Sequence, residues 1–404
     1  MDNSKKLAII NAIPYGSTGK IVRGIEEIAR DKSWETFIYY SWTKNYKKSD
    51  RDNIMVGSFL DKSIHIFFSK LTGYNGCFSF FDTWRLIRRL KKEKPDVINL
   101  HILHSWSVNL PMLFSYIKKC NIPVIWTMHD CWAFTGQCPH FVMASCDKWK
   151  TGCHDCPQYK AYPSAYVDRT KTMWGYKKKW FNGVKNLTVV TPSAWLSDLV
   201  KKSFLGEYPV KVIHNGIDPS VFQPRESDFR EKYHCENKTV LLGVAFDWGQ
   251  RKGLDVFVEL AKRLDDTYRI VLVGTNDELD KQLPQNIISI HRTQNQIELA
   301  EIYSAADIFL NPTREDTYPT VNMESLACGT PVITFCTGGS PEILQWGGGR
   351  VCPVDDIDAF ERAILEFREN PSAMKVNRDD IIKQIDQKEK YREYLNLVTE
   401  LVEA

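Results

Sequence analysis

REDTYPTVNMESLACGTP, residues 314–331, follows the apolar run ADIFLNPT at 306–313, which is typical of a buried strand that ends in a turn. Residues 320–327 favour a short helix, and Gly329 and Pro331 close it. Polar and acidic side chains therefore gather where a strand passes into a helix. In open α/β sheets ligands bind at such a junction, and the N–H groups of the helix start attract anions.

Two carboxylates mark this junction. Asp316 lies in the loop, and Glu324 lies eight positions later, inside the predicted helix. One carboxylate can meet a ligand above the helix start while the other approaches it from the side of the helix. Carboxylates accept hydrogen bonds from sugar hydroxyls, and a phosphate suits the helix start. The alternative is a capped surface loop, because helix starts are often acidic.

The stretch resembles the E-x7-E signature of the retaining glycosyltransferases of family 4, whose fold is called GT-B. The resemblance is close downstream, where ESLACGTPVI (324–333) is followed by TGGSPEIL (337–344), and it covers most of residues 7–370. The first carboxylate can be Asp316 or Glu315. The ED-x-[FY]-P pattern looks like that of capsule and colanic-acid transferases.

The resemblance implies an α/β fold of two doubly wound Rossmann-like domains that face an interdomain cleft. The alternation of strand and helix patterns in both halves agrees with that architecture. We predict an acceptor-side domain at 1–208 and a nucleotide-sugar-binding domain at 209–375. Helices in residues 376–404 would cross back to the first domain.

The resemblance also implies residue roles. Lys252 matches the family lysine on the donor pyrophosphate, whereas the position of the family arginine holds Ala245 or Phe246. Arg251 would substitute for that arginine, and the two cations would stabilise the charge of a departing diphosphate. The alternative, exposed cations at a helix start, is opposed by the helix dipole. Asp316 or Glu315 would hold sugar hydroxyls, Glu324 the ribose, and His129 the transferred sugar, whereas His101 and His104 are more simply structural. The other expected donor-binding residues are Gly16, Gly19, Gly274, Arg292, Thr293, Thr320, Val321, Gly338 and Gly339.

Residues 131–156 form a cysteine-rich insertion in the first domain. Cys138, Cys146, Cys153 and Cys156 have C-x7-C-x6-C-x2-C spacing. In a reducing cytosol clustered thiols favour a metal over disulfides, and Zn²⁺ with four thiolates would staple an insertion that has little apolar content. Free thiols or disulfides are the alternative, and a catalytic metal is a weaker one. The resemblance implies no cofactor for catalysis, so any zinc would be structural.

Charge is divided unevenly along the chain. Residues 1–205 hold 31 Lys and Arg against 16 Asp and Glu, a net of +15, and the remainder holds 22 against 34, a net of −12. Such an asymmetry predicts an anionic partner for the first half, such as a membrane surface, a pyrophosphate-linked lipid or a nucleic acid. A solvated basic surface is the alternative.

Two segments could carry such a contact. Residues 64–92 are first aromatic and then basic. KTMWGYKKKW (171–180) is predicted to place Trp174, Lys177, Lys178 and Phe181 on one helix face, which suits a membrane interface or a nucleic acid. A helix packed on its own domain would have the same pattern.

No apolar run approaches about 18 residues, and the start of the chain is too polar for a signal peptide. We therefore predict a cytoplasmic protein, peripheral on the inner membrane face where its basic half binds lipid. It would move a hexose from a UDP- or GDP-sugar to a saccharide or lipid-linked oligosaccharide acceptor. The rivals are a GT-B epimerase, a phosphorylase, for which no pyridoxal-lysine signature is present, and a nucleic-acid-binding protein. The last leaves Lys252, Asp316 and Glu324 unexplained, so no nucleic-acid partner is expected.

Overall fold

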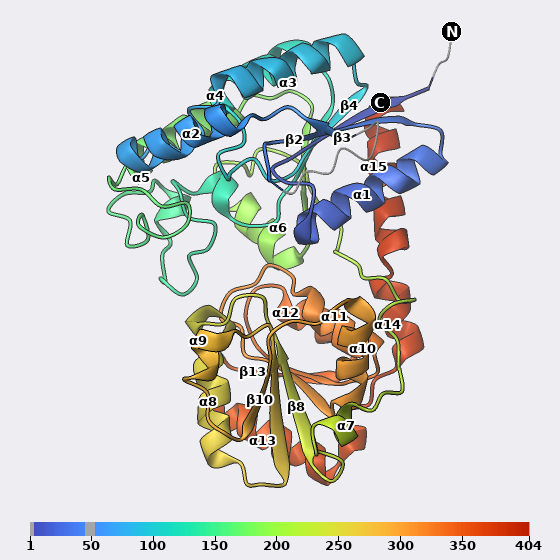
Figure 1. The fold of residues 1–404 in the computed structure, drawn as a ribbon. Coiled ribbons are helices and arrows are strands. Elements are labelled where there is room, and N and C mark those ends of the chain that lie inside the picture. Colours follow the sequence, from blue (N-terminus) through green and yellow to red (C-terminus); the bar gives the residue numbers. More distant parts are fainter. Residues whose placement is uncertain (1–3, 45–52, 404) are drawn as a thin grey trace. The chain divides into compact units, whose positions relative to one another are not determined.

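The computed structural model describes residues 4–44 and 53–403 and divides the chain into two compact units. Unit 1 comprises Met1–Ile213 and Lys390–Ala404, and unit 2 comprises His214–Glu389. Each unit is a parallel sheet with helices on both faces, so the prediction of two doubly wound α/β domains is confirmed (Figure 1).

The sheet of unit 1 has seven strands in the order β3-β2-β1-β4-β5-β6-β7, all parallel. Their bounds are β1 Lys6–Asn11, β2 Glu35–Tyr40, β3 Asn53–Met55, β4 Val97–Leu100, β5 Val124–Thr127, β6 Leu187–Thr191 and β7 Val210–Val212. The central strands β4, β5 and β6 are buried throughout, which explains their continuous apolar runs. Because β7 pairs with β6, the chain leaves unit 1 after Ile213, five residues beyond the predicted boundary.

The helices of unit 1 are α1 Gly16–Asp31, α2 Phe59–Thr72, α3 Phe80–Glu93, α4 Leu110–Cys120, α5 Thr170–Phe181, α6 Ala194–Lys201 and α15 Gln387–Glu403. Apolar side chains of α1 and α15 pack together with one face of the sheet, and those of α3, α4, α5 and α6 pack with the other. The end of the chain therefore completes one layer of unit 1. At the crossing of α1 and α15, a Cβ on Gly24 would lie 1.9 Å from the ring of Tyr391.

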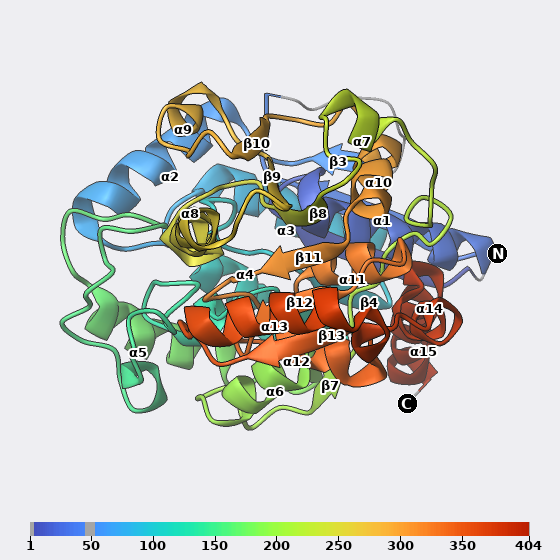
Figure 2. The same ribbon diagram turned by 90° about the horizontal axis from the view of Figure 1, so that it is seen from below.

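Unit 2 has six parallel strands in the order β10-β9-β8-β11-β12-β13. Their bounds are β8 Thr239–Val244, β9 Tyr268–Val273, β10 Ile287–Ile290, β11 Ile308–Asn311, β12 Val332–Phe335 and β13 Gly349–Cys352. The helices are α7 Phe229–Lys232, α8 Leu254–Arg263, α9 Asp277–Asp280, α10 Gln296–Ala305, α11 Thr320–Ala327, α12 Ser340–Ile343, α13 Ile357–Glu369 and α14 Arg378–Ile385. Helices α8 and α13 pack on one face and α10, α11 and α14 on the other (Figure 2).

The insertion in unit 1 is held by a buried lysine of α5. Lys177 is fully buried; its ammonium donates to the carbonyls of Trp132 (2.7 Å) and Thr135 (3.2 Å) and lies 3.5 Å from the centre of the Trp132 ring. Phe181 is also buried, so the predicted membrane-facing set on α5 is wrong for these two residues. The alternative of a helix packed on its own domain describes them.

We expect Tyr394→Ala to destabilise unit 1 by about 3 kcal/mol, because the side chain is buried between α15 and the sheet and its loss leaves a cavity. Chemical unfolding followed by tryptophan fluorescence measures the change. Asn396→Ala, an exposed position on the same helix, is the matched control. Equal stabilities for the two variants would contradict a structural role for α15 in unit 1.

Candidate functional site

Three neighbouring strands of unit 2 end at one edge of its sheet and supply most of the predicted site. β8, β11 and β12 are adjacent, and the loops after them carry Arg251 with Lys252, Glu315 with Asp316, and Gly338 with Gly339. Parallel strands bring such loops together although the residues are far apart in sequence.

The centre of the site is an ion pair. The Lys252 ammonium lies 2.7 Å from Oδ2 of Asp316, and both side chains are largely buried. Burial alone would raise the pKa of Asp316, but Lys252, with a hydrogen bond from the Tyr318 N–H, lowers that pKa below its ordinary value. Asp316 is therefore a carboxylate at neutral pH, and it faces a cation.

The neighbouring Glu315 is oriented differently. Its side chain is buried, and its carbonyl accepts a hydrogen bond from Nη1 of Arg251 at 3.4 Å. The carbonyl of Arg251 in turn accepts from the Arg314 N–H at 2.9 Å. Of the two candidates for the first carboxylate, Asp316 is the one paired with Lys252.

Arg314 is a residue that the sequence interpretation did not select. Its guanidinium makes a bidentate pair with Asp255 (2.8 and 2.7 Å) and a third contact with Asp355 (2.6 Å). These bonds fix the β11 loop to the start of α8 and to the loop after β13. The signal was present as the first residue of REDTYP, but only the fold reveals its two acidic partners.

Helix α11 begins directly behind the ion pair. Pro319 stands at its N-cap and makes no side-chain capping hydrogen bond to the first turn at Thr320 and Val321. Glu324 is half-buried on the same helix, and its Oε2 accepts a hydrogen bond from the Tyr303 hydroxyl at 3.2 Å. The start of α11 can therefore receive an anion, with one carboxylate beside it.

Two glycines allow neighbouring loops at this edge of the sheet to approach each other closely. Gly338 has φ +54°, and a Cβ there would lie 1.6 Å from the carbonyl oxygen of Asp316, so the 337–340 loop closes onto that carbonyl. Gly274 has φ +91°, and a Cβ there would lie 1.8 Å from the carbonyl oxygen of Ala245 in the loop after β8. Arg292 and Thr293 follow β10, which is separated from β8 by β9. They lie toward the edge of the sheet.

A chain of neutral rings lies at the carboxyl edge of the unit 1 sheet. Asn99 donates through Nδ2 to Thr127 Oγ1 (3.1 Å), which turns its Oδ1 toward His101 Nε2 (2.8 Å). His101 therefore carries its proton on Nε2, and its Nδ1 accepts from Nε2 of His129 at 3.0 Å. His129 thus donates through Nε2, and its basic atom is Nδ1.

A second network lies beside this chain. His104 Nε2 contacts Asp130 Oδ2 at 2.8 Å, and His104 Nδ1 lies 3.0 Å from the Tyr162 hydroxyl. Burial would raise the pKa of Asp130, but His104 and the Trp132 N–H outweigh it and lower that pKa to about 2. The hydrogen bonds made by the side chains of His101 and His104 fit the structural interpretation of both residues.

At the start of α1, Gly16 has φ +74°, and a Cβ on Gly19 would lie 2.7 Å from the Pro14 carbonyl carbon.

Four cysteines of the insertion lie near one another, but their sulfur atoms do not surround a common centre. All eleven cysteines are free thiols, and Cys138, Cys146, Cys153 and Cys156 line one small cavity. Among the described residues, only Asp277, Asp280 and His291 bring three ligand atoms within 4.8 Å of one another, and these three are exposed. The four thiols fit zinc in kind and line one cavity, but tetrahedral coordination would require their sulfur atoms to draw nearer to one another.

The pKa values of these thiols differ. A hydrogen bond with Cys138 lowers the pKa of Cys156 to about 7, and burial raises the pKa of Cys153 to about 11. Burial lowers the pKa of Lys177 to about 7, while thiolates at Cys153 and Cys138 would raise it. The charge of Lys177 and thiolate formation in the insertion therefore favour each other.

We expect unit 1 to lose stability as the pH falls from about 7.5 to about 5.5. Burial lowers the pKa of His65 to about 3, that of His129 to about 4, and that of His101 well below its ordinary value. The unfolded rings take up protons near pH 6.5, whereas the folded ones remain neutral. Below about pH 6.5, each of these rings therefore lowers the free energy of unfolding by about 1.4 kcal/mol per pH unit.

Urea unfolding across this pH range measures the effect. His65→Gln should reduce the slope of stability against pH, and His154→Gln, at an exposed position, should leave it unchanged. A wild-type stability independent of pH in this range would contradict neutral buried rings.

None of the helices in the described part of the chain combines the length and the apolar character that crossing a bilayer needs. Two protein-family models match the sequence. The model described as Glycosyltransferase Family 4 matches residues 56–221, and the model described as Glycosyl transferases group 1 matches residues 237–370.

Relatives and solved structures agree with these matches. The chain is 26% identical over 287 residues to the putative colanic acid biosynthesis glycosyl transferase WcaC of Escherichia coli (strain K12), covering 69% of each chain. It superposes on sucrose-phosphate synthase from Thermosynechococcus elongatus (TM-score 0.70, 15% identity, 98% and 99% coverage). It also superposes on Anabaena Alr3699/HepE in complex with UDP-glucose (TM-score 0.68, 13% identity, 98% and 99% coverage). These matches give no support to the epimerase, phosphorylase or nucleic-acid-binding alternatives.

Proposed function

This chain belongs to the group 1 and family 4 glycosyltransferases, which have the GT-B fold, and we propose that it is a retaining hexosyltransferase. Its donor would be a UDP- or GDP-hexose, and its acceptor a growing, lipid-linked surface polysaccharide on the cytoplasmic side of a membrane. The name of the E. coli relative, which refers to colanic acid, and the UDP-glucose complex of the Anabaena protein support these choices.

The observation that carries the proposal is the Lys252–Asp316 pair at 2.7 Å, beside Arg251 and the start of α11. Two cations and free N–H groups at one edge suit a diphosphate, and an ionised carboxylate next to them suits sugar hydroxyls. Glu324, on the side of the same helix, would accept from the ribose. Arg292 and Thr293 would contact the base of the donor nucleotide.

In the proposed reaction the bond between the sugar C1 and the diphosphate oxygen breaks as the acceptor hydroxyl oxygen bonds to C1 on the same face. The hydroxyl proton passes to an oxygen of the departing phosphate, so no separate base is needed. Arg251, Lys252 and the N–H groups of Thr320 and Val321 would stabilise the charge that develops on the leaving group. No cofactor or divalent metal is then required.

His129 is the residue of unit 1 that we propose contacts the transferred sugar. Its ring is neutral because burial lowers its pKa to about 4, and its Nε2–H is committed to His101. A neutral ring positions a hydroxyl without adding a charge near the reacting carbon. The glycine loop with Gly16 and Gly19 would let backbone approach the substrates.

Thermal shift with UDP, GDP, ADP and CMP tests the donor site. We expect one diphosphate to raise the melting temperature by mass action, about 2.7 kcal/mol of stabilisation at a hundredfold excess over Kd. Lys252→Ala and Glu324→Ala should lose most of this shift. In a transfer assay, Lys252→Ala should lower kcat/KM by about 10²-fold or more.

Lys262→Ala removes an exposed lysine of α8 and is the matched control, which should bind and turn over as the wild type does. No shift with any of the four nucleotides, from protein shown to be folded, would count against the transferase proposal. Full activity in Lys252→Ala would refute only the proposed role of the ion pair and would leave the transferase proposal standing.

We also propose that Cys138, Cys146, Cys153 and Cys156 hold a structural zinc ion. The support is their shared cavity, the Gly136 N–H that donates to Cys153 Sγ at 3.2 Å, and the buried cation of Lys177. Four thiolates and Zn²⁺ carry two negative charges, which a buried ammonium would partly offset. The ion would supply cross-links, and none of the proposed transfer steps involves it.

We expect about one zinc per chain by elemental analysis of protein prepared without chelator, and a lower melting temperature after chelation. Cys138→Ser and Cys156→Ser should lose the metal. Cys336→Ser, at an exposed cysteine outside the insertion, should keep it. Metal-free wild-type protein with an undiminished melting temperature would overturn the zinc proposal and leave the donor site unaffected.

A further inference from the structure

Helix α2 is amphipathic in the reverse sense: its polar side faces the protein and its apolar side faces outward. The buried residues of the helix are Asp61, His65 and Ser69, which recur every four positions. The exposed large side chains are Phe59, Leu60, Ile64, Phe67, Phe68 and Leu71. Leu60 is 69% exposed and Phe67 61%, so this stripe is an unburied apolar surface rather than the edge of a core.

Hydrogen bonds fix α2 in this orientation. Asp61 accepts from the Asp82 N–H at 2.9 Å, and His65 lies between Ser79 Oγ (2.6 Å) and the Gly76 N–H (3.1 Å). Turning the helix over would bury the phenylalanines but strand three polar groups. The fold therefore holds an apolar stripe outward, and contiguous exposed apolar surface of this kind marks an interaction site.

The start of α3 extends the same surface. Asp82 joins the starts of α2 and α3, because it donates to Asp61 and accepts from Ser58. Phe80, Phe81 and Trp84 lie within the first five residues of α3 and are all exposed, Phe81 to 70%. Aromatic side chains from two helices thus continue the apolar stripe.

Cations greatly outnumber carboxylates at the surface of these helices, although Glu93 lies near Arg89 (3.7 Å) and Lys92 (3.8 Å). On α2 and α3, Asp61 and Asp82 are buried and Glu93 is half-buried. The exposed cations of α3 and its C-cap are Arg85, Arg88, Arg89, Lys91, Lys92 and Lys94. Exposed aromatic rings bordered by lysines and arginines, with the carboxylates withdrawn, complement an anionic lipid surface.

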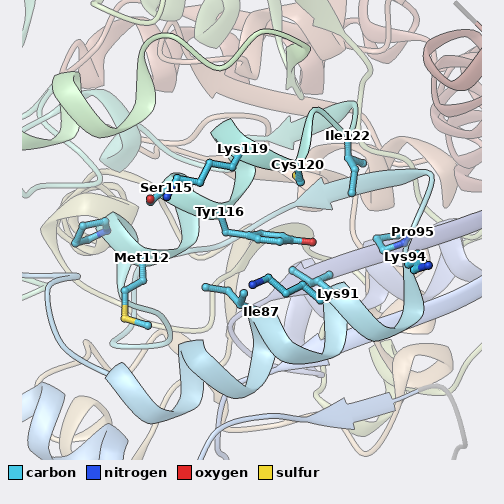
Figure 3. Close-up of a pocket in the computed structure, with 12 residues that line it drawn as sticks. Ile87, Lys91, Lys94, Pro95, Met112, Ser115, Tyr116, Lys119, Cys120 and Ile122 are labelled. Carbon is cyan, nitrogen blue, oxygen red and sulfur yellow. The ribbon is translucent and has the colours of Figure 1, made fainter.

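The other flank of α3 repeats this chemistry. A groove of about 880 Å³ lies between α3 and α4, with Ile87, Met112, Tyr116 and Ile122 among the apolar side chains that line it (Figure 3). Lys91, Lys94 and Lys119 also line it. An apolar groove that carries ammonium groups fits an acyl chain beneath a phosphate headgroup.

We propose that α2 and the outer side of α3 dock unit 1 on an anionic phospholipid bilayer, with the α2 stripe and Phe80, Phe81 and Trp84 entering the interface. The cations of α3 would contact lipid phosphates. A second copy of the chain fits less well, because two such basic surfaces repel each other. The proposal does not depend on the transferase chemistry of unit 2.

Flotation of the full chain with vesicles tests it. We expect binding to mixed phosphatidylcholine–phosphatidylglycerol vesicles, at least about tenfold weaker binding to phosphatidylcholine alone, and weakening by salt. Leu60→Ser with Phe67→Ser should reduce binding at least about tenfold, and its melting temperature shows that it is folded. Ile297→Ser with Leu365→Ser, at exposed positions of α10 and α13, is the matched control and should bind normally.

Lys91→Gln with Lys92→Gln separates the charge from the apolar stripe. It should weaken binding to the anionic vesicles and leave binding to phosphatidylcholine unchanged. Absence of wild-type binding to either vesicle, or equal binding by the Leu60 and Phe67 variant, would overturn the proposal. So would concentration-dependent self-association in ultracentrifugation that this variant abolishes while vesicles remain unbound, because a second copy would then cover the stripe.

Discussion

The ion pair between Lys252 and Asp316 joins two loops whose residues are 64 positions apart, and the arrangement of the carboxyl edge of the unit 2 sheet depends on it. Both groups are largely buried, so removing either partner would leave an uncompensated charge. The surrounding bonds hold the pair in place: Arg314 clamps the β11 loop through Asp255 and Asp355, and Gly338 lets the next loop close on the Asp316 carbonyl. The charged groups are thus fixed relative to one another without a ligand, and in the proposed transfer this would limit reorganisation during the reaction.

Unit 1 uses buried polar groups differently. Its carboxyl edge holds neutral rings, in which the Asn99 amide sets the tautomer of His101 and His101 accepts from His129. Neutrality follows from burial, which makes a charged ring costly. In the insertion the buried cation of Lys177 is instead solvated by two carbonyls and a tryptophan ring. Unit 2 therefore concentrates charge suited to phosphates, whereas the edge of unit 1 positions hydrogen bonds through neutral rings that lie beside the Asp130 carboxylate.

Helix α2 shows how a local polar constraint can decide what a surface presents. Asp61, His65 and Ser69 turn inward because the loop and helix start beside them offer hydrogen-bond partners. The phenylalanines are exposed as a consequence. Part of the net charge of +15 that residues 1–205 carry therefore lies on the outer side of α3.

The sequence by itself determined the two α/β units, the helix at 320–327 and the motif positions of Lys252, Asp316 and Glu324, because strand–helix alternation and the spacing of a local motif are written along the chain. Tertiary structure decided which carboxylate meets Lys252, since Glu315 and Asp316 are adjacent in sequence and both end in a carboxylate. It also decided that Lys177 is buried and that α2 faces outward with its apolar side. Helical periodicity gives the two sides of a helix but not which one faces the core, because that choice rests on partners distant in sequence. The acidic clamp on Arg314 was hidden for the same reason: Asp255 and Asp355 approach it only when the sheet is assembled.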